Sequence, residues 1–105
     1  MKRVINGKLY NTETAKEVFT WSNHYYRNDF HYCEETLYRS PKGAFFVAGE
    51  GGPMSKYAVP VGSNGRGGGD GLEVLSEAEA LTWLEEKGAD VETIERFFPG
   101  RIEEA

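Results

Sequence analysis

Two short runs open the chain, each with a polar start and an apolar end: Lys2 to Ile5 and Lys8 to Tyr10. They flank the pair Asn6-Gly7. Because asparagine and glycine tolerate positive φ, this pair favours a two-residue type I′ turn. The pattern therefore predicts a β-hairpin at the N-terminus.

The next segment has apolar residues at helical spacing, at Ala15, Val18 and Phe19. Asn11 and Thr12 come just before it, and their side chains can cap exposed amides at the start of a helix. We therefore predict a helix over residues 12–22.

Two apolar and aromatic runs then surround a turn. Residues 30–39 are rich in aromatic residues and threonine, Ser40 to Gly43 suit a turn, and residues 44–48 are apolar throughout. Because Phe45 and Phe46 point to opposite faces of a strand, the second strand needs cover on both sides. The pattern predicts a central β-hairpin with a helix on at least one face.

Two segments are expected to be loops. Between Ser22 and Asp29 turn-forming residues interrupt any regular pattern, and this loop carries Tyr25 and Tyr26. Residues 62–71 contain six glycines. Glycine loses the most conformational freedom on ordering, so we expect this second segment to be a flexible loop.

The C-terminal third has the strongest helical signals. Residues 72–75 suit a final strand, after which Ser76 and Glu79 have the spacing of a capping box. We predict a helix over residues 77–87 that ends at Gly88, followed by a second short helix that starts at Asp90.

These elements predict one α+β domain over residues 1–105, with a charged tail at residues 101–105. It has an antiparallel sheet of about four or five strands, one N-terminal helix packed on the sheet, and a C-terminal helical pair. A chain of 105 residues, 39% of them apolar, fits one domain. We expect a monomer or a weak homodimer, since no heptad pattern demands an oligomer.

Composition also suggests where the protein works. Cys33 is the single cysteine and can form no internal disulfide, which is typical of a reducing compartment. No apolar run follows Met1, and the longest uncharged apolar stretch, Ala44 to Gly49, is too short to cross a bilayer. We expect a cytoplasmic protein without a membrane segment.

Charge is distributed unevenly within the net −5 of the chain. Residues 1–71 carry nine basic and seven acidic residues, a net of +2, whereas residues 72–105 carry three basic and ten acidic residues, a net of −7. An acidic surface is attracted to basic partners, including the nucleic-acid channels of other proteins. The structural alternative is that glutamate-rich helices merely have a solvated face.

The residues that carry chemistry do not identify an enzyme, a metal site or a cofactor. The glycine-rich segment lacks the Gly-Lys-Ser/Thr triplet of a phosphate-binding loop, and His24, His31 and Cys33 match no metal-ligand spacing. If residues 30–39 form a strand, His31, Cys33 and Glu35 share one face. A small enzyme that uses His31 and Cys33 therefore remains an alternative, although a lone cysteine is more often a packing residue.

Aromatic residues support a further alternative, a nucleic-acid-binding regulator. Eight of the fourteen aromatic residues lie between Trp21 and Phe46, close to Arg27 and Arg39, and aromatic rings can stack on nucleobases. A pI of about 5.0 argues against general nucleic-acid binding, and core packing explains most of these rings. Tyr25 and Tyr26 could equally anchor a protein interface.

Several segments together resemble a group of small, mostly uncharacterised proteins from phages and mobile elements. The segments are Ile5 to Ala15, Glu35 to Arg39 with Phe45-Phe46, Gly49 to Tyr57, and a C-terminal pattern of Leu75-Ser76, Glu79-Ala80, Trp83-Leu84 and Ala89-Asp90. This group includes anti-CRISPR proteins, which act stoichiometrically by occluding a working surface of an effector complex. The resemblance implies a non-catalytic inhibitor of a host protein complex.

Under this hypothesis the acidic third supplies the interface, because acidic side chains accelerate association with a basic channel. The candidate partner-binding residues are Glu77, Glu79, Glu85, Glu86, Glu92 and Glu95, together with Tyr25 and Tyr26. We expect no direct nucleic-acid binding, no metal and no cofactor.

Overall fold

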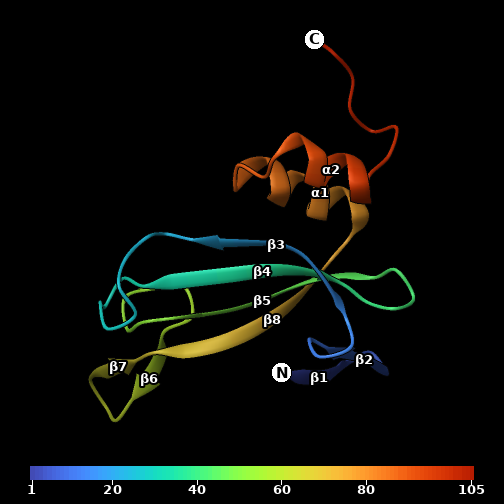
Figure 1. Cartoon of the computed structure of the whole chain (residues 1–105). Coiled ribbons are helices and arrows are strands. Elements are labelled where there is room, and N and C mark those ends of the chain that lie inside the picture. The colour runs from blue at the N-terminus through green and yellow to red at the C-terminus, as the bar shows by residue number, and fades with distance from the viewer.

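The computed structural model describes residues 1–105, and four antiparallel strands form its main sheet (Figure 1). In spatial order these strands are β3 (Lys16–Ser22), β4 (Cys33–Arg39), β5 (Phe45–Gly51) and β8 (Gly69–Leu75). The predicted central hairpin is confirmed as β4 and β5, which pair from Cys33 with Gly51 to Arg39 with Phe45.

The predicted N-terminal hairpin is also confirmed. It consists of β1 (Lys2–Ile5) and β2 (Lys8–Asn11), joined by Asn6 and Gly7, whose φ angles of 51° and 76° are both positive. The hairpin lies on the opposite side of the main sheet from the helices (Figure 1). Tyr10 is buried there, edge-to-face with the ring of Phe46 at 5.4 Å between centroids.

Two helices cover the other face of the sheet (Figure 1). Helix α1 (Glu77–Glu86) has the predicted capping box: Ser76 N–H donates to Glu79 Oε1 at 2.8 Å, and Glu79 N–H donates to Ser76 Oγ at 3.1 Å. Gly88 follows with a φ of 74°, and helix α2 is Val91–Phe97. Neither helix is long and apolar enough to span a bilayer.

The core lies between these helices and the sheet. Its eight buried members are Val18, Leu37, Phe45, Val47, Ala80, Leu84, Phe97 and Phe98. On the opposite face, Phe46 is fully buried and stacks on Tyr38 with 5.3 Å between ring centroids. As predicted, β5 is therefore covered on both sides.

The predicted N-terminal helix over residues 12–22 is wrong. Asn11 starts a turn instead, in which its carbonyl accepts from Ala15 N–H and its side-chain oxygen accepts from Glu13 N–H. Residues 16–22 form β3, with a bulge between Glu17 and Phe19. The apolar spacing fits either element, and the β-branched and aromatic residues of this segment favour a strand once β4 is available to pair with it.

The expected loop at residues 62–71 is also largely strand. Gly65–Gly67 is β7, which pairs with β6 (Val59–Val61), and from Gly69 onward the chain is already in β8. The strand β8 pairs in regular register with β5, for example Gly71 with Gly49 and Leu75 with Phe45. Pairing with a central strand thus overcomes the low strand propensity of glycine.

Candidate functional site

The six predicted interface glutamates all lie on α1 and α2, and all are exposed. Two of them have partners: Glu77 forms an ion pair with Arg101 at 3.0 Å, and Glu79 caps the start of α1. The other four have no ion pair within 4 Å. We call these four residues the acidic helical face: Glu85, Glu86, Glu92 and Glu95.

A nearby lysine is directed away from this face. Lys87 follows α1 directly, but its ammonium lies 3.3 Å from Glu35 Oε1 and 3.8 Å from the centroid of the Trp21 ring. A cation held over an aromatic face and beside a carboxylate is well satisfied. Lys87 therefore compensates a charge of the sheet instead of the charges of the acidic helical face.

Glu35 is the centre of this second charged region. It is only 1% exposed, and its Oε2 accepts from Tyr57 Oη at 2.6 Å and from Lys56 Nζ at 3.0 Å. Together with Lys87, these partners surround the carboxylate from two separate parts of the chain. We call Glu35, Lys56, Tyr57 and Lys87 the Glu35 cluster.

The charge states in this cluster follow from burial and hydrogen bonding. Burial acts most strongly and raises the pKa of Glu35, but hydrogen bonds from Tyr57 and Lys56 and the charges of both lysines outweigh it and leave that pKa lowered. Burial and the Glu35 carboxylate raise the pKa of Tyr57. Glu35 is therefore ionised and Tyr57 protonated near neutral pH.

Cys33 and His31, the candidate catalytic pair, lie in surroundings that differ from those of an active site. Burial, followed by the charge of Glu35, raises the pKa of the Cys33 thiol, which is the opposite of what an activated nucleophile requires. His31 lies outside the strand, is half exposed, and contacts Asp29 at 3.3 Å. The predicted sharing of one strand face by His31, Cys33 and Glu35 is therefore wrong for His31, and the chain has no group of three potential metal ligands.

The segment from Glu50 to Tyr57 is the corner that brings two cluster members to the sheet. Tyr57 lies so close over Gly49 that a Cβ on that glycine would overlap the phenol. Gly51 and Gly52 likewise approach the backbone of Tyr32 and Phe30 too closely for a side chain. These glycines are explained by close packing.

Tyr25 and Tyr26 are exposed on the loop before β4, as expected, and Tyr26 is 85% exposed. The structure adds two apolar side chains that the sequence pattern did not indicate, Phe30 at 64% and Met54 at 62% exposed. The two segments that carry them are joined by a hydrogen bond from Met54 N–H to the Phe30 carbonyl at 2.8 Å. Their exposure depends on the contact between these two segments, and the periodicity of the sequence does not predict that contact.

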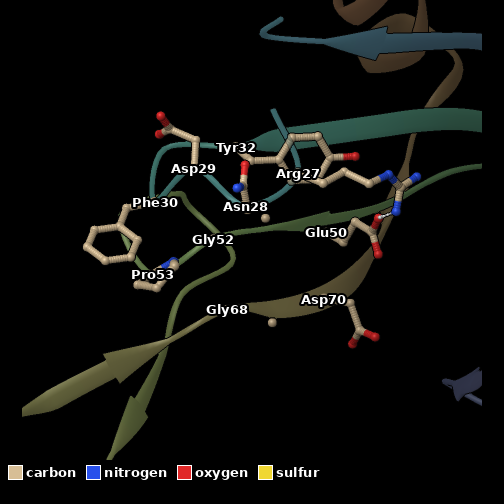
Figure 2. Close-up of a pocket in the computed structure, with 12 residues that line it drawn as sticks. Arg27, Asn28, Asp29, Phe30, Tyr32, Glu50, Gly52, Pro53, Gly68 and Asp70 are labelled. Atoms are coloured by element: carbon tan, nitrogen blue, oxygen red, sulfur yellow. Dashed lines mark hydrogen bonds and ion pairs between the residues drawn. The ribbon is translucent and has the colours of Figure 1, made fainter. Parts of the chain in front are cut away.

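An open pocket of about 520 Å³ lies beside this loop (Figure 2). Arg27 points across it to Glu50, with 3.4 Å between the charged atoms, and Asp70 faces the same space from β8. The ring of Phe30 points away from the pocket beside Pro53 (Figure 2). The carboxylates around Arg27 make this region poorly suited to binding phosphate.

Comparisons with protein-family models, with curated proteins and with solved structures found no match to this chain. Function is therefore inferred from the charges and geometry of its own residues.

Proposed function

We propose that this chain is a non-catalytic protein that binds and inhibits a host defence complex through the acidic helical face of α1 and α2. The single observation that carries this proposal is which charged side chains have a partner within the protein and which do not. Four exposed glutamates on the helices have no ion pair, while the lysine next to them is bound to the buried Glu35. Exposed glutamates without an intramolecular partner are available to pair with a basic partner.

The resemblance to phage proteins that include anti-CRISPR proteins suggests the class of target. An effector complex that holds nucleic acid has a basic channel, and a rigid acidic surface can compete for it. Both helices are fixed on the sheet by the hydrophobic core, so their glutamates are held in place before binding. Preorganisation of this kind reduces the entropic cost of association.

The test is a plasmid-interference assay in host cells whose CRISPR system clears a targeted plasmid. Expression of the chain should restore plasmid retention. The variants Glu85→Lys/Glu86→Lys and Glu92→Lys/Glu95→Lys should each lose this effect, because they replace the acidic helical face with positive charge. Purified effector should bind the wild-type chain in competition with its nucleic acid.

The matched control is Glu13→Lys/Glu17→Lys. It changes net charge by the same amount at exposed residues outside the two helices, and should retain inhibition. If both acidic-face variants inhibit as well as the wild type, or if the wild type restores no plasmid in any system tested, the proposal is wrong.

The alternative of a nucleic-acid-binding regulator that uses residues 21–39 has less support. Tyr32 is buried, Arg27 is paired with Glu50, and Arg39 lies over the ring of Phe45 at 5.7 Å. The two arginines of the region thus have partners within the protein, whereas Tyr25, Tyr26 and Phe30 are exposed. A salt-sensitive shift of DNA or RNA mobility would restore this alternative.

A further inference from the structure

The strand β8 is an edge of the main sheet and has no partner on its outer side. Its only hydrogen-bonded neighbour is β5, and no backbone hydrogen bond outside the regular elements involves residues 69–75. All seven residues of β8 are in unbroken register with β5, so its outer amides and carbonyls form a regular row. Such a row is a template for an added strand.

The opposite edge of the sheet is different. The strand β3 contains a bulge at Val18, begins with Lys16, and contacts α2. A bulge, an edge lysine and a covering helix are devices by which proteins blunt a sheet edge. Of the two edges, β8 is therefore the one suited to accept a strand.

A groove of about 350 Å³ runs between β8 and α1. Glu73 and Leu75 line it from the strand, and Glu79, Trp83 and Glu86 are among the residues that line it from the helix. Side chains alternate across a strand, so every second residue of a strand added beside β8 would point toward this groove. Those side chains would meet apolar surface flanked by three carboxylates.

We infer that β8 and this groove bind an extended, basic segment of the partner protein by strand addition, with alternate lysine or arginine side chains directed at Glu73, Glu79 and Glu86. The inference rests on the proposed function and specifies how the partner is held. Backbone hydrogen bonds supply affinity in this mode, and the side chains that enter the groove supply specificity. Charge selects the occupant, because a second copy of this chain would bring two acidic grooves together.

The test uses a fluorescein-labelled peptide of alternating lysine and valine, and the same peptide with alternate amides N-methylated. By fluorescence anisotropy, the unmodified peptide should bind the intact chain, and amide hydrogen exchange should slow in residues 69–75. N-methylation removes the donors along one peptide edge without changing its charge. It should weaken binding by about tenfold or more if strand pairing carries the affinity.

Variants distinguish the groove from general charge attraction. Glu73→Lys/Glu86→Lys should weaken peptide binding by about tenfold or more, whereas Glu13→Lys/Glu17→Lys, which is matched in charge, should bind the peptide as the wild type does. Circular dichroism and thermal melting check that each variant is folded.

Three results would overturn the inference. The first is that the unmodified peptide does not bind the chain, and the second is that both peptides bind equally well. The third is that sedimentation shows self-association of the free chain through β8. The peptide assay contains no defence complex, so its outcome is independent of plasmid interference. Peptide binding by a chain that fails to inhibit would reject the proposed function alone.

Discussion

Glutamate has opposite surroundings in two regions of this molecule. Glu35 is buried and surrounded by Tyr57, Lys56 and Lys87, whereas Glu85 and Glu92 are exposed and have no ion pair. A buried charge must be compensated inside the protein, while an exposed one is compensated by water until a partner arrives. The same residue type thus maintains the structure in one region and is available for binding in the other.

Removal of the buried carboxylate should have the largest effect on stability. Glu35→Ala leaves Lys87 and the phenol of Tyr57 without their shared acceptor, and breaking a buried ion pair in this way costs about 3 to 5 kcal/mol. Chemical denaturation should report this loss. A loss of less than about 0.5 kcal/mol, typical of a surface site, would contradict the assigned role of the cluster.

Acid should weaken the protein through the same residue. The pKa of Glu35 is lowered in the folded state, so its contribution is fully present above its unfolded pKa of about 4.3 and is lost as pH falls through the folded value. The free energy of unfolding, measured by chemical denaturation at a series of descending pH values, should therefore fall as the pH drops below about 4.3. Glu35→Gln should flatten this dependence, and an unchanged pH profile in Glu35→Gln would assign the acid sensitivity elsewhere.

A side chain at Gly49 should disturb the cluster less than loss of the carboxylate. Gly49→Ala places a Cβ inside the phenol of Tyr57 and should cost about 1 to 3 kcal/mol by overpacking. Gly71→Ala is the graded control, because its Cβ would lie 3.2 Å from the same ring. Melting temperatures should fall in the order wild type, Gly71→Ala, Gly49→Ala, and the reverse order of the two variants would refute the packing account.

The start of α1 should respond by a smaller amount. Ser76→Ala removes the acceptor for Glu79 N–H and should cost about 1 kcal/mol. Ser76→Asp retains a capping oxygen and serves as the comparison. Equal stability of the alanine and aspartate variants, measured by denaturation, would mean that tertiary packing alone holds the helix.

The acidic helical face should contribute least to stability. Glu85→Ala/Glu92→Ala should change the free energy of unfolding by no more than about 0.5 kcal/mol per site, because both side chains are exposed and have no ion pair. Partner binding, measured by titration calorimetry, should nevertheless weaken. A large loss of stability in Glu85→Ala/Glu92→Ala would contradict the distinction between a structural Glu35 and exposed glutamates that are available for binding.

Sequence alone determined the elements whose signals are local. The Asn6-Gly7 turn, the capping box at Ser76 and Glu79, and the helix that follows it are each specified within a few residues. In these cases the backbone conformation and the hydrogen-bonding partners come from neighbouring positions. The central hairpin was predictable for the same reason.

Tertiary structure decided the elements whose partners are distant in the chain. Residues 16–22 and 69–75 are strands because they pair with β4 and β5, although the first segment has helical spacing and the second begins in a run of glycines. Glu35 is a buried, compensated carboxylate because Lys56, Tyr57 and Lys87 come together around it. Pairing and charge compensation depend on distances in space, and no local pattern of residues specifies those distances.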